Sequence, residues 1–236
     1  MNSNTYKIFG IGLPRSGTSS LNQALSILGY KSLHHPTYYI MDKLNGSFSF
    51  EGDWDALTNF GEHFYPQLDE LYPNSKFILT TRDKEKWLNS CRWKYQEPSN
   101  NLGNAIRISI FGCDRFHEST YSYIYDQHTR NVIEYFKNRP NDLLVVDWGL
   151  GHGWKELCYF LNKPVPETPF PNKNSKQEII LLDRPINYKV KRNTGLNNIP
   201  NYFYSEILSQ AFLGNKLAKI MVEFVKKNKF NKTKKR

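Results

Sequence analysis

Near the start of the chain, glycine, arginine and hydroxyl residues are spaced as in an anion-binding loop. The stretch Gly12-Leu13-Pro14-Arg15-Ser16-Gly17-Thr18-Ser19 follows a short apolar run and opens a helical pattern. In a strand–loop–helix arrangement, the backbone N–H groups of the loop and the N-terminus of the helix point at one spot, which favours an anion. Gly12 and Gly17 permit the positive φ angles and close backbone approach that such a loop needs.

The spacing departs at one position from that of a loop that binds nucleoside triphosphates. Gly12-x4-Gly17 followed by Thr18 and Ser19 matches Gly-x4-Gly-Lys-Ser/Thr, except that Thr18 stands at the lysine. That lysine contacts the terminal phosphates of a bound triphosphate. The nearest cation in this loop is Arg15. Because the rest of the spacing matches, the loop still leaves two functions open. The first is a nucleotide kinase or NTPase, and the second is a nucleotide-binding protein without catalysis.

Another pair of candidate ligands follows residues 76–81. This near-continuous apolar run predicts a buried parallel strand, and Arg82 comes directly after it. An arginine at the end of such a strand can present its guanidinium fork to a phosphate. Ser90, on the helix predicted next, can turn its hydroxyl to the same anion.

Two histidines are candidates for moving a proton. His34 and His35 follow a short strand predicted at residues 31–33, and a neutral imidazole can accept a proton near pH 7. Asp53 and Asp55 are the competing carboxylates. Because ligands of an open parallel sheet bind beyond the carboxyl ends of its strands, we expect His34 and His35 to lie near the glycine loop.

Asn59 and Arg82 should reach this same edge of the sheet, each following a predicted strand. The amide of Asn59 cannot act as a base.

A further cluster of aromatic residues between 93 and 125 predicts either an acceptor pocket with its lid or the core of inserted helices. The sequence leaves both interpretations open.

The elements that position these residues alternate between strands and helices. Strands are predicted around residues 8–11 and at 31–33, 55–58, 76–81 and 143–147. Helices are predicted at 16–28, 38–44, 64–71, 83–95, 102–111, 121–136, 154–161 and 205–226, and a proline-rich loop at 163–176. This alternation predicts an α/β fold in which helices wrap a parallel sheet.

Composition narrows the class of protein. The net charge is +10, but seven basic residues and no acid lie within residues 226–236, which leaves +3 for the rest. We therefore expect one α/β domain at 1–225 with a flexible basic tail at 226–236, and no nucleic acid as the main ligand. The lack of a signal sequence or a long apolar run predicts a cytoplasmic protein without a membrane span. The three cysteines suit reduced thiols, and no cluster of metal ligands is visible.

The two anion motifs together resemble those of sulfotransferases that use 3′-phosphoadenylyl sulfate (PAPS). Residues 13–19 resemble the 5′-phosphosulfate loop of that family. Residues 76–82 with Ser90 resemble its 3′-phosphate motif, including the interval from Arg82 to the serine. Residues 143–172 resemble a third shared block. The resemblance covers about residues 6–174 and is nearest to small sulfotransferases of uncharacterised substrate.

The resemblance implies a three-layer, P-loop-like α/β fold and roles for individual residues. Ser16, Gly17, Thr18 and Ser19 would hold the sulfate and 5′-phosphate of PAPS. Arg15 matches the loop cation of the family, a lysine in the cytosolic enzymes, which can stabilise charge on the leaving phosphate. Arg82 and Ser90 would bind the 3′-phosphate. Arg192 would join them from a basic segment, although the glycine expected after the basic pair is Asn193.

The implied reaction moves a sulfuryl group from PAPS to a hydroxyl or amine and needs no metal. The acceptor would be a small molecule or a glycan. The His34–His35 pair is our candidate base, with His34 ahead because it better fits a histidine found after this strand in the subgroup.

Overall fold

The computed structural model describes residues 6–36, 50, 52–99 and 101–172. The helices predicted at 38–44 and 205–226, Arg192 and the basic tail lie outside the described residues, so these predictions stay untested. Residues 163–172 form neither helix nor strand, as predicted for the proline-rich loop.

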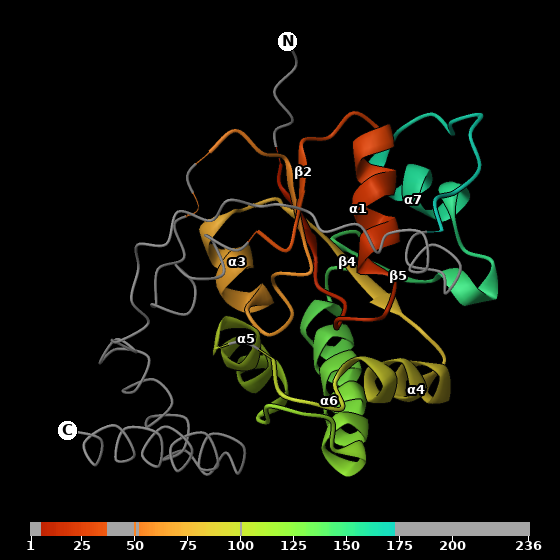
Figure 1. Cartoon of the computed structure of the whole chain (residues 1–236). Coiled ribbons are helices and arrows are strands. Elements are labelled where there is room, and N and C mark those ends of the chain that lie inside the picture. Colours follow the sequence, from red (N-terminus) through yellow and green to blue (C-terminus); the bar gives the residue numbers. More distant parts are fainter. Residues whose placement is uncertain (1–5, 37–49, 51, 100, 173–236) are drawn as a thin grey trace, which may run out of the picture.

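Five parallel strands form one sheet in the order β2-β3-β1-β4-β5 (Figure 1). Their bounds are β1 Ile8–Gly10, β2 Ser32–His34, β3 Ala56–Thr58, β4 Lys76–Thr81 and β5 Leu143–Asp147. Because every pairing is parallel, all five carboxyl ends reach the same edge of the sheet, where ligands of open α/β sheets bind.

Helices cover both faces of this sheet. They are α1 Thr18–Ile27, α3 Tyr65–Leu71, α4 Lys84–Lys94, α5 Asn101–Phe111, α6 Glu118–Phe136 and α7 Trp154–Leu161. Alternation along β1 explains the layers. Ile8 packs in a cluster with residues of α1 and α7, whereas Phe9 packs with residues of α3 and α6. The predicted three-layer α/β fold is confirmed.

Two helices begin two or more residues away from the predicted start. α1 begins at Thr18 rather than residue 16, because Gly17 before it has a left-handed φ of 102° that no helix residue adopts. α6 begins at Glu118 rather than residue 121, with His117 as its N-cap. A glutamate in the first turn is favourable beside the positive end of the helix dipole.

A third hydrophobic cluster lies beyond the carboxyl ends of the strands. Residues of α4, α5 and α6 pack there on Leu13 of the glycine loop. These helices therefore both support the loop and extend the protein past the sheet (Figure 1).

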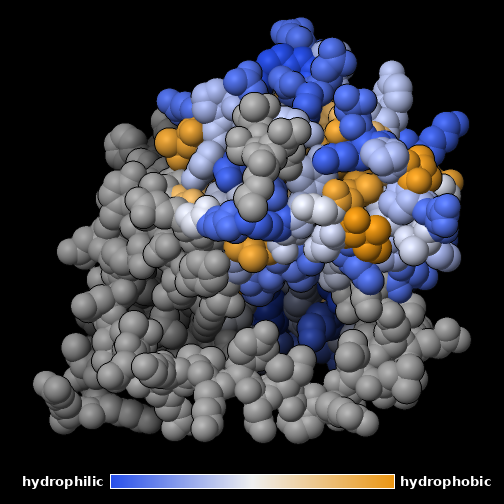
Figure 2. Space-filling model, turned by 90° about the horizontal axis from the view of Figure 1, so that it is seen from above, coloured by the Kyte–Doolittle hydropathy of each residue, from blue (hydrophilic) through white to orange (hydrophobic). Residues whose placement is uncertain are grey.

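The surface on the side away from α4, α5 and α6 is seen from above in Figure 2. Where the described residues are visible, it is largely hydrophilic, with apolar side chains in small patches. Among the described helices, none combines the length and apolarity needed to cross a bilayer.

Candidate active site

Two close contacts shape the loop after β1. A Cβ on Gly12 would lie 2.0 Å from Oγ1 of Thr80, the neighbour in β4. Gly17 has a φ of 102°, and a Cβ there would lie 2.4 Å from the Trp148 ring. The Trp148 Nε1 donates to the Gly17 carbonyl over 3.1 Å. Gly17 therefore requires glycine for conformation and for space. Gly12 requires it for space alone, because it lacks the positive φ that the sequence predicts there.

The hydroxyl residues of the loop differ in their surroundings. Ser16 is buried, and its hydroxyl contacts the Leu13 carbonyl at 2.6 Å and the Thr80 Oγ1 at 2.7 Å. Its backbone N–H donates to Leu13 as well. Ser16 therefore holds the loop in shape. Thr18 and Ser19 open α1, where the positive end of the helix dipole favours an anion.

Arg15 connects the glycine loop to the end of β4. Its φ of 75° is left-handed, and its Nε donates to the Ser90 Oγ over 3.1 Å. The Arg82 Nη1 donates to the Arg15 carbonyl over 3.4 Å. The structure thus brings Arg15, Arg82 and Ser90 together from three different segments. Arg15 contacts both Arg82 and Ser90 and thereby connects them.

Further contacts fix the backbone that carries this cluster. The Tyr125 hydroxyl of α6 accepts from the Arg82 N–H at 3.2 Å and donates to the Arg82 carbonyl. The Trp87 Nε1 of α4 donates to the Pro14 carbonyl at 2.9 Å, and the Trp87 ring packs on Tyr125 at 4.8 Å between centroids. Arg82 and the glycine loop are therefore held by the same pair of aromatic residues.

His34 ends β2 beside the start of α1. Its Nε2 lies 3.2 Å from the Ser19 Oγ, and its Nδ1 lies 2.9 Å from the Thr58 Oγ1. The Thr58 hydroxyl has its own acceptors, the Asn22 Oδ1 at 3.3 Å and the Leu33 carbonyl at 3.4 Å. This favours a proton on Nδ1 of His34 and leaves Nε2 as the acceptor facing Ser19. Burial, with a smaller contribution from His35, lowers the pKa of His34 to about 4, so the imidazole is neutral at pH 7.

His35 and Asn59 form a second pair at this edge. The Asn59 Nδ2 lies 2.9 Å from the His35 Nδ1, and both residues have left-handed φ angles, 53° and 50°. The Asn59 Oδ1 is buried with no hydrogen-bond partner among the described residues. Left-handed φ angles cost energy outside glycine, less for asparagine than for most residues, and such costs concentrate at functional sites.

A cavity of about 750 Å³ opens beside these histidines. Pro14 of the glycine loop, His34, His35 and Asn59 line it on one side. Residues of α4, α5 and the segment between them line the other side, among them Trp93, Tyr95 and Phe111 from the predicted aromatic cluster. Tyr121 and Phe116 of that cluster instead pack in the hydrophobic core. The aromatic cluster is thus divided between the wall of a cavity and the core of the inserted helices, and Phe111 belongs to both.

The glycine loop and the Arg15–Arg82–Ser90 cluster lie together at the carboxyl ends of the strands, and Pro14 of the loop also lines the cavity. A family model described as a sulfotransferase domain matches residues 7–179. The chain belongs to this sulfotransferase family. Another comparison finds "Ava biosynthesis cluster protein M" of Aspergillus versicolor, 27% identical, with the alignment covering 79% of this chain and 88% of the relative.

The structure also places the carboxylates of the alternatives considered from the sequence. Asp53 and Asp55 precede β3 and contact Lys31 before β2, so they lie at the amino-terminal edge, away from the glycine loop. Asp147, at the place of a magnesium-binding carboxylate in NTPases, accepts from the Gly149 N–H at 2.7 Å and caps the turn Trp148–Leu150. One oxygen of its carboxylate, Oδ1, is therefore engaged in local structure.

Sequence reasoning missed two buried ionisable residues of the cavity. Glu62, between β3 and α3, is buried at 2% exposure, and Arg107 of α5 at 7%. Arg107 donates to the carbonyls of Glu97 and Asp114 and lies over the Tyr95 ring. Glu62 follows the end of β3 by four residues, which is the one signal that places it near the site. The irregular pattern around Arg107 gives no such signal.

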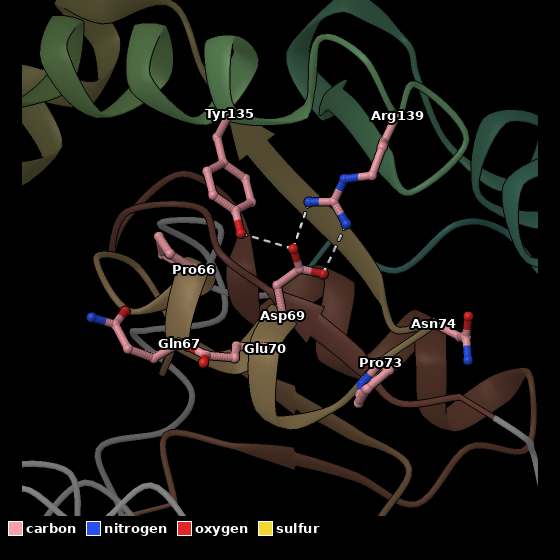
Figure 3. A pocket seen from close by; sticks show the side chains of 8 residues that line it. All are labelled: Pro66, Gln67, Asp69, Glu70, Pro73, Asn74, Tyr135 and Arg139. Carbon is pink, nitrogen blue, oxygen red and sulfur yellow. Dashed lines mark hydrogen bonds and ion pairs between the residues drawn. The ribbon is translucent and has the colours of Figure 1, made fainter.

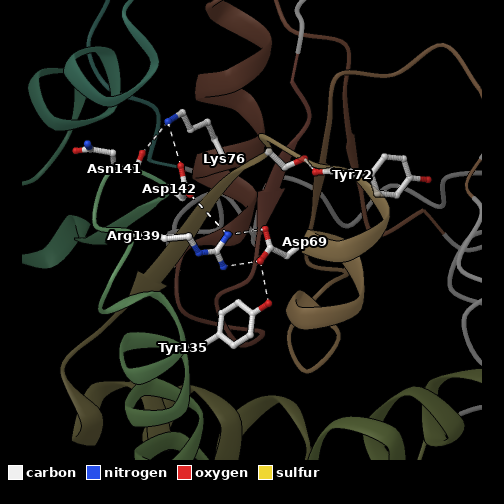
Figure 4. A network of polar contacts seen from close by, with 8 residues as sticks. Asp69, Tyr72, Lys76, Tyr135, Arg139, Asn141 and Asp142 are labelled. Carbon is white, nitrogen blue, oxygen red and sulfur yellow. Dashed lines mark hydrogen bonds and ion pairs between the residues drawn. The ribbon is translucent and has the colours of Figure 1, made fainter.

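A smaller groove, of about 510 Å³, lies where α3 meets the end of α6. It is lined by residues of α3, the turn before β4 and the end of α6 (Figure 3). Arg139 binds both oxygens of Asp69, at 3.1 and 2.5 Å, and the Tyr135 hydroxyl donates to Asp69 at 2.8 Å. Figure 4 shows the network continuing through Asp142 to Lys76. Its polar groups satisfy one another, which indicates a structural connection between α3, α6 and the sheet.

This network should make stability depend on acid pH. Burial opposes ionisation of Asp69, but the hydrogen bonds from Arg139 and Tyr135 prevail and hold its pKa below the ordinary value. Its stabilising contribution is therefore present above that ordinary value and is lost as the pH falls through the lowered pKa. We expect Asp69→Asn to reduce the free energy of unfolding by about 1–2 kcal/mol at pH 7 and much less at pH 3.

Urea denaturation of both proteins at the two pH values measures this difference. Glu70→Gln is the matched control, because Glu70 is an exposed neighbour in the same groove. An equal loss of stability at pH 7 and pH 3 would show that the carboxylate charge of Asp69 contributes nothing.

Proposed function

We propose that this sulfotransferase takes its sulfuryl group from PAPS and transfers it to a hydroxyl or amine of a small organic molecule. The observation that carries the proposal is the convergence of Arg15, Arg82 and Ser90 on a glycine loop that has threonine in place of the triphosphate-binding lysine. One anion at the loop and another at the end of β4 are what a nucleotide phosphorylated at both the 5′ and 3′ positions requires.

The residues present fit this donor. The absence of side chains at Gly12 and Gly17 lets Thr80 and Trp148 pack against the loop, which holds it folded before the start of α1, where the helix dipole favours an anion. When bound, PAPS supplies the activated sulfuryl group. Thr18 and Ser19 would hold its sulfate and 5′-phosphate at the start of α1. Arg82 and Ser90 would hold its 3′-phosphate, and Arg15, which touches both segments, would stabilise negative charge between them.

The residues around His34 suit transfer of a proton from the acceptor. Its Nε2 faces Ser19 at the loop, and His34 also lines the cavity where an acceptor would lie. His34 is thus the side chain that we assign as the base, receiving the proton on Nε2. His35, bonded to Asn59, would orient the acceptor instead. Glu62 in the same cavity is the competing carboxylate.

The acceptor class, the metal requirement, the cellular location and the domain boundary are supported less directly by the site. The relative named for a biosynthesis cluster accords with a small-molecule acceptor. The reaction scheme assigns no role to a metal. A cytoplasmic location, the boundary of the domain at residue 225 and a contribution of Arg192 stay predictions from the sequence.

Thermal unfolding with different nucleotides tests the donor. Saturation with 3′-phosphoadenosine 5′-phosphate (PAP), at about 100 times its dissociation constant, should raise the melting temperature by about 5–10 °C. Magnesium ATP should raise it much less, because the loop lacks the lysine. The reverse order would instead support the kinase or NTPase. Binding of PAP without any sulfated product from PAPS, across a broad panel of acceptors, would favour the non-catalytic alternative.

A further inference from the structure

A line of hydrogen bonds connects two residues of α1 through the ends of β2 and β3. The Ser19 Oγ lies 3.2 Å from the His34 Nε2, and the His34 Nδ1 lies 2.9 Å from the Thr58 Oγ1. The Thr58 hydroxyl donates to the Asn22 Oδ1 over 3.3 Å, and the Ser32 hydroxyl donates to the same oxygen over 2.8 Å. The line therefore begins at Ser19, in the proposed sulfate site, and ends at a side-chain carbonyl.

The register of the sheet places Thr58 beside the imidazole. Thr58 pairs with Gly10 of β1 on one side and with His34 of β2 on the other. Residues paired in this way point to the same face of the sheet, and Ile8 and Ala56, two positions earlier in their strands, pack with residues of α1. A Cβ at Gly10 would lie 3.1 Å from the Thr58 Cγ2. Gly10 therefore makes room for Thr58, which is fully buried.

The acceptors within reach of Thr58 decide which nitrogen of His34 carries the proton. A hydroxyl has a single proton to donate, and the Thr58 hydroxyl faces the carbonyl oxygens of Asn22 and Leu33. Neither oxygen can donate, so the Thr58 proton points to one of them and an Oγ1 lone pair faces the imidazole. Nδ1 of His34 is then the donor, and Nε2 keeps its lone pair for Ser19.

Asn22 is unfavourable for the helix in which it lies. It is an interior residue of α1, where asparagine supports a helix less well than alanine or leucine does. Its side-chain oxygen instead accepts from the hydroxyls of Ser32 and Thr58, on two neighbouring strands. An apolar residue would stabilise α1 but would accept neither proton. This conflict with local propensity indicates a role for the Asn22 carbonyl outside the helix.

We propose that Thr58 and Asn22 are positioning residues that hold the base His34 as the Nδ1–H tautomer, with Nε2 open to the acceptor. At transfer, Nε2 takes the proton of the acceptor and the ring becomes an imidazolium, whose Nδ1–H stays bonded to Thr58. The proton later leaves from Nε2 to solvent. The opposite tautomer would present an N–H group to the acceptor and could not take the proton. This inference rests on the proposed function, because it uses the same base.

Correlation spectra of the imidazole nitrogens and ring protons identify the tautomer in the ¹⁵N-labelled full chain at pH 7. The signals of His34 are those that His34→Gln removes. We expect the wild type to show a protonated Nδ1 and an unprotonated Nε2. Thr58→Val keeps the shape of the side chain but removes the acceptor of Nδ1–H, so the proton should move to Nε2, where it can bond Ser19. Thr58→Ser restores the hydroxyl and should restore the Nδ1–H tautomer.

Turnover should follow the tautomer. Thr58→Val should lower kcat by about 10–100-fold and change the KM values for PAPS and acceptor by less than about threefold, because the base is misdirected while the binding groups stay in place. Thr58→Ser should recover most of this loss. Ser75→Ala is the matched control, since it also removes a buried hydroxyl that donates to a carbonyl, but before β4 at the opposite edge of the sheet. Its kcat should equal that of the wild type.

Asn22→Leu provides a second test that does not disturb the buried strand. Leucine favours the helix, so stability should not fall. The Thr58 hydroxyl keeps the Leu33 carbonyl as an acceptor, so the tautomer should shift only in part toward Nε2–H and kcat should fall by about 3–10-fold. Unchanged imidazole signals in Asn22→Leu would overturn the role of Asn22.

The role of Thr58 fails if the wild type carries its proton on Nε2, or if Thr58→Val leaves either the tautomer or kcat unchanged. The imidazole spectra need no nucleotide, so this failure is distinguishable from failure of the proposed function. If PAP does not bind or no sulfated product forms, the proposed function is wrong. If sulfated product forms and His34 is the Nε2–H tautomer, the function stands and the positioning by Thr58 and Asn22 is wrong.

Discussion

Replacing Arg82 with alanine is expected to weaken the binding of PAP by about 10- to 100-fold while leaving the binding of 5′-AMP nearly unchanged. A guanidinium that donates to a phosphate contributes about 1.5–3 kcal/mol, and 5′-AMP lacks the 3′-phosphate that Arg82 would bind. The ratio of the two dissociation constants, measured by titration calorimetry, therefore isolates this one contact. Arg82→Lys should recover only part of the ratio, because an ammonium lacks the bidentate fork.

The surroundings of Arg82 provide a second, milder variant. Tyr125→Phe removes the hydroxyl that contacts the Arg82 N–H and carbonyl but keeps the ring against Trp87. If Tyr125 positions Arg82, this variant should lower the PAP to 5′-AMP preference by about threefold, through misplacement of one hydrogen-bonding group. A purely structural role would reduce stability and weaken both nucleotides together.

Arg92→Ala is the matched control for Arg82→Ala. Arg92 lies on α4 near Ser90, has a side chain that is 43% exposed, and is paired with Glu118. Its loss should leave the preference for PAP intact. Equal weakening of PAP and 5′-AMP in Arg82→Ala would remove Arg82 from the 3′-phosphate site.

The fold was predictable because its elements carry strong local signals. The bounds of β4, β5 and α7 agree with the predicted ranges, since each combines a clear apolar pattern with a sharp boundary. The edge at which the candidate residues meet was predictable as well. Parallel strands all end there, so residues that follow strands, such as His34, Asn59 and Arg82, must converge.

The cavity could not be predicted in the same way, because its far wall comes from helices beyond the sheet. Which aromatic residues face a cavity and which face the core depends on how α4, α5 and α6 pack. Tyr121 and Trp93 look alike in the sequence, yet one is buried and the other exposed. Likewise, Arg15 contacts Ser90 from a backbone with a left-handed φ, which cannot be predicted from the residue type.

His34→Gln is expected to reduce turnover by about 100-fold or more while changing the affinity for PAP by less than about threefold. A positioned general base contributes about 10²–10⁴ in rate, and glutamine can keep a polar contact with Ser19 but cannot take up a proton. Turnover is measured as sulfated product, with the acceptor that reacts best. His35→Gln should mainly raise the concentration of acceptor needed for half-maximal rate, because His35 contacts Asn59 rather than the glycine loop.

The pH dependence separates a base from a residue that merely packs. Because burial lowers the pKa of His34 to about 4, its imidazole is neutral at pH 7, and the rate should fall as the pH drops through that value. The unfolded chain, with a histidine pKa near 6.5, binds more protons between about pH 6.5 and 4, so the wild type also loses stability across this window. His34→Gln should lack both the acidic fall in rate and this loss of stability.

Glu62→Gln decides between the two proton acceptors of the cavity. If His34 is the base, this variant should keep the acidic fall in rate and most of the turnover, since Glu62 would only shape the cavity. If turnover instead collapses in Glu62→Gln and survives in His34→Gln, the carboxylate is the base. His34 would then serve to hold Ser19 and the start of α1 in place, through the same 3.2 Å contact.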